Sequence, residues 1–300
     1  KMIINRKIHQ NRQDKLLSWL FLIPVLLILV VAAFIPLAFG LGLSVTNYEP
    51  GIENTQFVGL ANYVRLFTAE LFQQSVRNNI LFALMAVGLE LIFGTFLAII
   101  ISHDSRGNRL LTTIVLIPMT IAPVAAGILW RLLLDRTYGA VNYFLSFFGV
   151  EAIGWLSDHR VALYSIAMVD FWQFTPFVAI LIVSSIKGVP RSFVEAALAD
   201  GASQFKIIYK IVLPMIAPTL VIVAMIRFID AFKVFGTVFV MTGGGPGNAT
   251  LLLPNYIYQE GIRFFKVGFS SAIAMVFIAF MFLLAGLFIK LRNAQMRRFQ

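Results

Sequence analysis

The chain has 300 residues, of which 59% are hydrophobic and only 13% are charged. Its mean hydropathy is +0.87, whereas a soluble domain is about half apolar and about a quarter charged. A single globule cannot bury this much apolar side chain, so most of the chain is expected to lie in a lipid bilayer. The sequence has no cysteine, which excludes disulfides, thiol nucleophiles, iron–sulfur clusters and cysteine-ligated zinc.

Lysine and arginine give the chain a formal net charge of +10. In a soluble protein such a charge would indicate a nucleic-acid partner, but cytoplasmic segments of membrane proteins are enriched in the same two residues. We therefore interpret the basic residues as a signal of membrane topology. The three histidines, His9, His103 and His159, are far apart in the sequence and do not indicate a metal site.

Apolar runs long enough to cross a bilayer, about 20 residues each, recur six times along the chain. The first is too long for a cleaved signal peptide and is not followed by a small-residue cleavage site, so we expect it to remain as an anchor. The six predicted spans are residues 16–43, 79–102, 110–134, 161–186, 214–241 and 267–291. The sequence therefore predicts an all-α membrane protein with six transmembrane helices.

The basic residues outside these spans predict the orientation. Fifteen lysines and arginines, including Lys290 at the very end of the sixth span, lie in the two terminal regions and in the loops after the second and fourth spans, whereas six lie in the opposite loops. Because the cytoplasmic side carries the excess, both termini are expected to be cytoplasmic. The predicted parts are an amino-terminal segment (1–15), a six-span membrane domain (16–291) and a cytoplasmic tail (292–300). The first segment is either a short interfacial helix or a frayed tail.

The long cytoplasmic segment, residues 187–213, is predicted to form two short helices joined at a glycine. Ser192 and Glu195 have the spacing of a capping box, which satisfies the first free amides of a helix. Gly201 suits the left-handed residue that closes a helix, and residues 203–212 then place apolar side chains on one face of a second helix. The segment is either a hairpin lying on the inner leaflet or, because its alanines leave little bulk, a knob that fits a groove of another protein.

The same segment resembles the EAA signature of permease subunits of binding-protein-dependent ABC importers. In that family this loop contains the coupling helix, which sits in a cleft of the ATPase subunit. The spans agree with the family in number and order over essentially the whole chain. By this resemblance, the residues that couple to the ATPase are Glu195, Ala196, Ala197, Asp200, Gly201, Ala202 and Pro214.

A second stretch is similar to the carbohydrate-uptake branch of that family, which includes maltose-type and glycerol-3-phosphate-type permeases. It comprises residues 242–250, Thr-Gly-Gly-Gly-Pro-Gly-Asn-Ala-Thr, and Tyr256-Ile-Tyr258, and it resembles the first of the two paired permeases. The chain differs from the maltose-type subunit in having neither extra amino-terminal spans nor a large external domain. No Gly-Lys-Ser/Thr follows the glycine run, so it is not a phosphate loop.

The resemblance implies the fold of ABC importer permeases such as that of the methionine importer, in a subunit that is itself non-catalytic. It implies a second permease, which would form a heterodimer with this chain, two ATPase subunits that bind ATP and Mg²⁺, and an external solute-binding protein. The chain would bind no cofactor and no metal. It would form half of the path for a carbohydrate, polyol or oligosaccharide in the cytoplasmic membrane of a bacterium or archaeon.

Charged residues inside spans are the remaining candidates for a site, because each costs about 2.5–3.5 kcal/mol at the centre of a membrane helix. Arg227, Asp230 and Lys233 lie at intervals of three on the fifth span and occupy one face about 120° wide. Asp170 and Glu90 lie at a comparable depth in the fourth and second spans. These five residues are expected to face protein or water, either as structural ion pairs or as substrate contacts.

Aromatic side chains at a similar depth favour a carbohydrate path, because flat rings stack on the CH faces of sugars while polar groups bind the hydroxyls. Gln173 is a further polar candidate. The predicted substrate-path residues are Trp130, Asp170, Trp172, Gln173, Arg227, Phe228, Asp230 and Lys233.

Two other classes of function stay open. An ion-coupled secondary transporter would use Glu90, Asp170 and Asp230 as carriers of protons or sodium ions, although six spans without an inverted repeat argue against it. An intramembrane enzyme or scaffold ranks last, because an enzyme needs a nucleophile–base or metal pair and the predicted spans contain no histidine.

Overall fold

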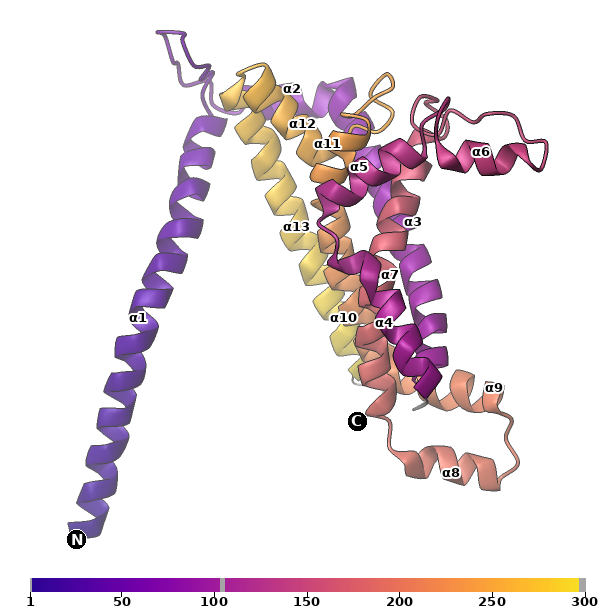
Figure 1. Cartoon of the computed structure of the whole chain (residues 1–300). Coiled ribbons are helices and arrows are strands. Elements are labelled where there is room, and N and C mark those ends of the chain that lie inside the picture. The colour runs from indigo at the N-terminus through magenta and orange to yellow at the C-terminus, as the bar shows by residue number, and fades with distance from the viewer. Residues whose placement is uncertain (1, 103–105, 297–300) are drawn as a thin grey trace. The chain divides into compact units, whose positions relative to one another are not determined.

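The computed structural model describes residues 2–102 and 106–296. Apart from an isolated β-bridge between Thr46 and Phe57, regular structure in these ranges is helical, which confirms the prediction of an all-α protein (Figure 1). The long helices are α1 (Met2–Ser44), α3 (Glu70–Ile101), α7 (Ala162–Lys187), α10 (Leu213–Phe232) and α13 (Val267–Met296). The shorter ones are α2 (Ala61–Thr68), α4 (Arg106–Thr120), α5 (Pro123–Leu133), α6 (Ala140–Ser146), α8 (Arg191–Ala199), α9 (Gln204–Ile207), α11 (Gly236–Met241) and α12 (Leu253–Tyr258), with π-helical turns at Ile208–Val212 and Gln259–Arg263.

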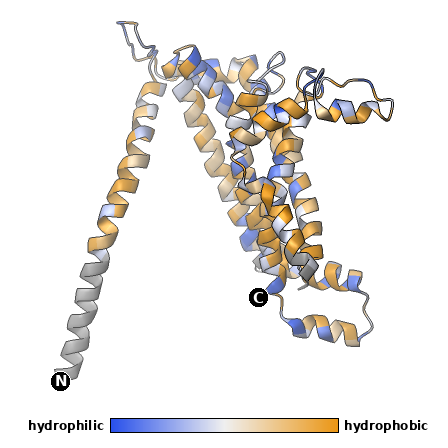
Figure 2. Ribbon diagram, viewed as in Figure 1, coloured by the Kyte–Doolittle hydropathy of each residue, from blue (hydrophilic) through white to orange (hydrophobic). Residues whose placement is uncertain are grey.

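Five of the described helices are long and apolar enough to cross a membrane, or six if one bent pair counts as a crossing. α1 runs without a break from Met2, so residues 2–15 continue the helix of the first span. Apolar residues predominate along α13 and along the coloured part of α1 (Figure 2), whose most apolar stretch lies within Trp19–Ser44. A helix this apolar is suited to a lipid bilayer or to contact with other membrane helices.

The third predicted span is not a single helix. α4 and α5 are separate helices whose axes differ by 94°. Ala122 between them is extended (φ −59°, ψ 136°), because the residue before a proline avoids the helical region. Gln173 of α7 donates its side-chain amide to the carbonyl of Ile121 at 2.7 Å, so a carbonyl freed by the break has a partner. The prediction of one helix over 110–134 is therefore wrong.

The fifth predicted span, 214–241, is also interrupted. α10 ends at Phe232, and α11 follows after a short loop. Asn79 of α3 donates its side-chain amide to the carbonyl of Phe232 at 3.3 Å, and Asn255 donates to the carbonyl of Phe235 at 3.4 Å. These side chains supply the partners that backbone carbonyls need where a helix breaks at membrane depth.

The chain falls into two compact units. The first comprises Lys1–Leu66 and Glu260–Met275, and the second comprises Phe67–Gln259 and Val276–Gln300. In the first unit, the side-chain amide of Asn62 donates to the carbonyls of Ser44 (2.9 Å) and Thr46 (2.8 Å). These two bonds tie α2 to the end of α1.

The second unit is built on α3 and α7, which share the most extensive contact between helices. Gly94 lies where they pack closely, because a Cβ at this position would stand 2.6 Å from Cγ1 of Val178. Small residues permit such close approach of membrane helices. α10 packs on both helices, and all three contribute to a core that includes Phe82, Ile166 and Ala231.

The glycine-rich loop at 242–250 lies at the end of the second unit opposite α8 (Figure 1). Three of its glycines have positive φ values, from 55° to 97°, which residues with a Cβ rarely adopt. Asn78 of α3 donates its side-chain amide to the carbonyls of Asn248 (3.1 Å) and Leu251 (3.2 Å). The loop is therefore a turn cluster that α3 holds in place.

Candidate functional site

The segment from α8 to the π-helical turn, residues 191–212, is here named the α8–α9 hairpin. It joins α7 to α10 and lies at the end of the second unit away from α5 and α6 (Figure 1). α8 has Pro190 as its N-cap, and no side chain caps it. The carbonyl of Pro190 accepts from the amide of Phe193 at 3.2 Å, so the helix begins before Ser192. The predicted capping box of Ser192 and Glu195 is therefore wrong.

The end of α8 agrees with the prediction. Gly201 has φ +73°. Its amide donates to the carbonyl of Leu198 (3.0 Å), and the amide of Ala202 donates to the carbonyl of Ala197 (2.9 Å). This pair of bonds is the Schellman motif, which closes a helix with a left-handed glycine. Nothing lies within 4 Å of the position that a Cβ on Gly201 would occupy, so the turn is open on its outside.

Large apolar side chains on the hairpin are uncovered. No residue of α8 is buried, and Phe193, Phe205 and Tyr209 are exposed to 53%, 78% and 64%. The predicted apolar face of the second helix is split, because Val212 is buried whereas Phe205 and Tyr209 point to the surface. The residues of the predicted coupling signature are all exposed or half-buried: Glu195, Ala196, Ala197, Asp200, Gly201, Ala202 and Pro214.

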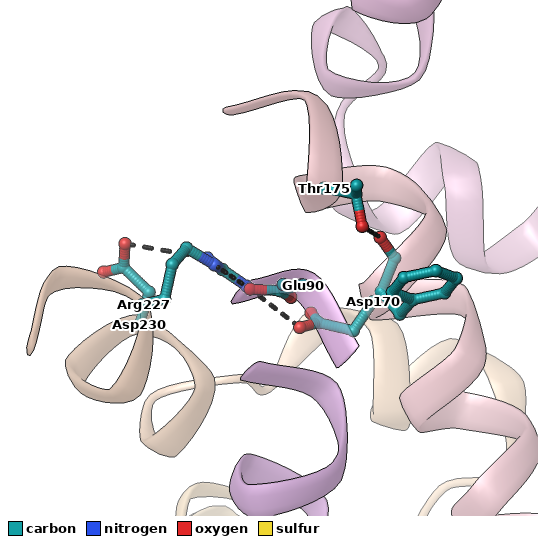
Figure 3. A network of polar contacts seen from close by, with 6 residues as sticks. Glu90, Asp170, Thr175, Arg227 and Asp230 are labelled. Carbon is teal, nitrogen blue, oxygen red and sulfur yellow. Dashed lines mark hydrogen bonds and ion pairs between the residues drawn. The ribbon is translucent and has the colours of Figure 1, made fainter. Parts of the chain in front are cut away.

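A cluster of charged side chains lies between α3, α7 and α10 (Figure 3). Arg227 of α10 donates from Nε to Oε2 of Glu90 at 2.6 Å and from Nη2 to Oε1 of the same carboxylate at 2.9 Å. Nη2 also donates to Oδ2 of Asp170 at 3.0 Å. The guanidinium stacks 4.1 Å from the ring centre of Phe174. The three charged side chains are at most 2% exposed, so this ion cluster is shielded from lipid and water.

Asp230 and Lys233 extend the ion cluster to the surface. A carboxylate oxygen of Asp230 lies 3.8 Å from Nη1 of Arg227, and the other lies 3.1 Å from Nζ of Lys233. The side chains of Asp230 and Lys233 are 45% and 55% exposed. The ladder along α10 is therefore present, but sequence reasoning missed that the shortest pairs of Arg227 cross to two other helices. The similar depth of Glu90, Asp170 and Arg227 in their spans was the signal that could have found this.

Three of the four tryptophans of the chain line one groove. Trp130 and Trp172 form an edge-to-face pair with ring centres 5.4 Å apart, and Trp155 joins them around a space of about 370 Å³. The indole of Trp155 donates to Oδ1 of Asn142 at 2.9 Å, which fixes its orientation. We name this space, bordered by α5 and α7, the tryptophan groove.

The other predicted path residues do not converge on the tryptophan groove. Gln173 is 1% exposed and uses its amide at the break between α4 and α5. Phe228 packs against Phe288, with ring centres 5.5 Å apart. Of the predicted set, Trp130 and Trp172 border the groove, Arg227 and Asp170 lie in the buried ion cluster, and Asp230 and Lys233 lie at its exposed end.

Comparison with known proteins identifies the family. The family model described as "Binding-protein-dependent transport system inner membrane component" matches residues 90–297. The chain belongs to this family. The permease is 34% identical over 286 residues to the "Trehalose/maltose transport system permease protein MalF" of Thermococcus litoralis. That match covers 94% of this chain and 95% of the relative.

Solved structures of ABC importers share the fold. A chain of a bacterial ABC transporter involved in the import of the acidic polysaccharide alginate superposes with a TM-score of 0.81 at 22% identity, covering 96% of this chain and 99% of that one. A chain of the MetNI methionine ABC transporter has a TM-score of 0.57 at 16% identity, covering 75% and 96%. The predicted fold of an ABC importer permease, akin to the methionine importer, is confirmed. The permease is thus a multi-pass membrane protein of the transport class.

Proposed function

We propose that this permease is the first of two different membrane subunits of an ATP-driven importer and forms half of the path for a carbohydrate, polyol or oligosaccharide. The family match supports the importer class, and the name of the Thermococcus litoralis relative supports the carbohydrate class. Two ATPase subunits would bind ATP and Mg²⁺, and an external solute-binding protein would deliver the substrate. The permease itself would be non-catalytic and hold no cofactor. It would lie in a bacterial or archaeal cytoplasmic membrane with both termini and the α8–α9 hairpin in the cytoplasm.

The observation that carries this proposal is the uncovered α8–α9 hairpin. Its aromatic side chains Phe193, Phe205 and Tyr209 are exposed, and no residue of α8 is buried. Aromatic side chains are enriched where protein surfaces meet. An ATPase cleft that receives α8 would cover them. Because the hairpin connects directly to α7 and α10, closure of the ATPase pair would move both helices.

The ion cluster would transmit that movement. Arg227 of α10 is hydrogen-bonded to the carboxylates of Glu90 on α3 and Asp170 on α7. Because of these bonds, the three helices would move together as one rigid body. A body of this kind can rock and expose a site alternately to the two sides of the membrane. We therefore infer a structural role for Arg227, Glu90 and Asp170. Asp230, Lys233, Trp130 and Trp172 would contact the substrate, with Gln173 and Phe228 bordering the path.

The ion-coupled alternative is not favoured. A carrier of protons or sodium ions has to exchange its cargo with water. Glu90 and Asp170 are both bonded to Arg227, and their side chains are at most 2% exposed. Membership of a binding-protein-dependent family also argues for an ATPase partner.

Replacing Gly201 with tryptophan tests the proposal. The bulky side chain would project from the open turn and obstruct docking, so co-purification of the ATPase subunits and ATP-driven uptake of maltose or another offered saccharide should both fall strongly. Gly149→Trp is the matched control. Gly149 has φ +72° and also has nothing within 4 Å of its Cβ position, so the backbone strain is the same at a site away from the hairpin.

Normal ATPase capture by Gly201→Trp would overturn the role of the hairpin. Uptake of solute by this chain alone in proteoliposomes, driven by an ion gradient without ATPase subunits, would overturn the importer class. Loss of capture in both variants would assign the effect to strain in a left-handed turn and would also count against the proposed docking role.

A further inference from the structure

A polar cavity of about 680 Å³ lies beside the glycine-rich loop. This loop is at the end of the second unit opposite α8 (Figure 1). The first turns of α3 contribute Glu70 and Arg77, and the segment that leads into α7 contributes His159 and Arg160. Ala249 of the glycine-rich loop completes the wall. We name this cavity the polar cup. Its volume lies within the range of about 300–1,000 Å³ that is usual for small-molecule sites.

The two arginines of the polar cup are unpaired. Within residues 2–102 and 106–296, neither the guanidinium of Arg77 nor that of Arg160 has an ion pair or a hydrogen bond. Arg227 shows the contrast, because its guanidinium has three carboxylates within 3.8 Å. One carboxylate, that of Glu70, lines the cup. Two free guanidinium forks on one cavity are suited to bind a carboxylate, sulfonate or phosphate, often through paired hydrogen bonds.

Neutral polar groups complete the wall of the polar cup. Gln74 and Asn78 line it and donate their side-chain amides to the carbonyl of Asn248 at 3.2 Å and 3.1 Å. Their amide oxygens have no partner among the described residues and remain as acceptors for hydroxyl groups. Because the same bonds fix both side chains against the glycine-rich loop, these acceptors are held in place before a ligand arrives.

Tyr164 lines both the polar cup and the tryptophan groove, so the two spaces share one wall. An aromatic ring therefore borders the charged and amide groups of the cup. Acyl chains of lipid would contact the aromatic ring but would form no hydrogen bond with the amide oxygens. A free inorganic anion would bind only the two arginines. A saccharide that carries an acidic group uses all three kinds of group.

We propose that the polar cup binds the anionic group of an acidic saccharide. Arg77 and Arg160 take its carboxylate, sulfonate or phosphate, the amide oxygens of Gln74 and Asn78 accept from its hydroxyls, and Tyr164 packs on the sugar ring. This inference rests on the proposed carbohydrate importer and narrows its substrate to acidic sugars. The cup is a receiving site at the membrane edge, separate from the ion cluster.

Equilibrium binding to the assembled transporter tests the proposal without ATP and without the binding protein. The transporter is placed in phosphatidylcholine nanodiscs, and the probes are a trimer of galacturonate and a neutral galactose trimer. We expect the acidic trimer to bind at least about tenfold more tightly than the neutral one, because charge-assisted hydrogen bonds are worth about 1.5–3 kcal/mol. The double variant Arg77→Gln/Arg160→Gln should lose this preference.

Arg136→Gln is the matched control, because Arg136 is an exposed arginine that does not line the polar cup. It should keep the affinity for the acidic trimer within twofold. All three mutated side chains are exposed, so the variants are expected to fold, and a monodisperse elution profile of each checks this. Equal binding of the two trimers by the unmodified transporter, or equal loss in the double and control variants, would overturn the proposal.

Two further outcomes would show that the polar cup binds something other than an acidic saccharide. If phosphatidylglycerol co-purifies with the unmodified transporter, is lost from the double variant and is not displaced by the acidic trimer, the cup is a lipid headgroup site and the proposal is wrong. If the double variant loses capture of the binding protein but keeps its affinity for the acidic trimer, the proposal is equally wrong.

ATP-driven uptake of the neutral trimer with no binding to the cup would refute this inference and leave the carbohydrate importer standing. Absence of uptake of any saccharide would refute the importer instead.

Discussion

The ion cluster and the α8–α9 hairpin contrast in how far the chain itself satisfies their side chains. In the cluster, every charge of Arg227, Glu90 and Asp170 has a partner within 3.0 Å on another helix. In the hairpin, Phe193 and Phe205 are more than half exposed. Membrane burial makes an unpaired charge costly, and water makes an exposed aromatic ring costly. The buried charges are therefore compensated within the chain, whereas the exposed aromatic rings of the hairpin need a partner to cover them.

This comparison separates stability from assembly. Side chains of the ion cluster should govern whether the permease folds, because their partners lie within the chain. Side chains of the hairpin should govern whether it assembles, because their partners lie outside it. Mutations in the ion cluster should therefore change the free energy of unfolding, and mutations in the hairpin should change the affinity for the ATPase subunits.

The largest effect is expected for Arg227→Met. The change leaves the carboxylates of Glu90 and Asp170 buried without a cation, and removing one partner of a buried pair costs about 3–5 kcal/mol. Titration of the purified protein with SDS in mixed micelles measures the free energy of unfolding. Lys233→Met is the control, because Lys233 is 55% exposed and should cost about 1 kcal/mol or less.

A rescue sharpens this first prediction. Adding Glu90→Gln and Asp170→Asn to Arg227→Met removes the two stranded charges, so part of the lost free energy should return. If the triple variant is no more stable than Arg227→Met, the cost does not come from uncompensated charge. If Arg227→Met is as stable as Lys233→Met, the ion cluster does not hold the three helices together.

An intermediate effect is expected for Gly94→Ala. The new methyl group would stand 2.6 Å from Cγ1 of Val178, so α3 and α7 would have to separate, and overpacking of this kind costs about 1–3 kcal/mol. Gly88→Ala on the same helix is the control, because nothing lies within 4 Å of its Cβ position. It should be neutral or stabilise by up to about 1 kcal/mol through helix propensity. Equal effects of the two changes in the SDS titration would show that the close approach at Gly94 does not limit packing.

The sequence alone predicts those structural features that depend on residues close together along the chain. Apolar runs of about 20 residues located the membrane-crossing segments, and a glycine after an alanine-rich helix predicted the left-handed turn at Gly201. The capping box failed because Ser-x-x-Glu is a permissive pattern, and the carbonyl of Pro190 was already in position to begin the helix. Local signals thus predict the end of a helix more reliably than the exact residue at which a helix begins.

The helix breaks depended on tertiary contacts instead. Proline alone does not predict them, because Pro24, Pro36, Pro176 and Pro218 lie inside α1, α7 and α10, which continue through them. The chain breaks near Ile121, where Gln173 from another helix satisfies a freed carbonyl. The bonds of Arg227 to Glu90 join residues 137 positions apart. Hydropathy gives the depth of each charge in the bilayer, whereas pairing also requires the rotation of each helix about its axis, which no local pattern contains.

The smallest effect on folding is expected for Phe205→Ala in the α8–α9 hairpin. Phe205 is 78% exposed, and among residues 2–102 and 106–296 its ring stacks only on Tyr209. The free energy of unfolding should therefore change by less than about 0.5 kcal/mol. Assembly should respond far more, because an aromatic anchor at the centre of an interface is commonly worth 2 kcal/mol or more, about a thirtyfold loss of affinity. Surface plasmon resonance between the detergent-solubilised permease pair and the ATPase subunit measures that loss.

Phe148→Ala provides the matched control for this last comparison. Phe148 is 70% exposed and its ring contacts Phe144. It follows α6 in the sequence, and α6 lies at the end of the second unit opposite α8 (Figure 1). The two variants remove the same side chain from equally open surroundings, so a general effect of lost apolar surface would weaken ATPase binding in both. If the hairpin is the surface that the partner covers, only Phe205→Ala weakens it, while both proteins unfold at the same SDS fraction as the unmodified permease. An unfolding shift in Phe205→Ala as large as that of Gly94→Ala would mean that the hairpin is part of the folded core after all, and the division between the two regions would fail.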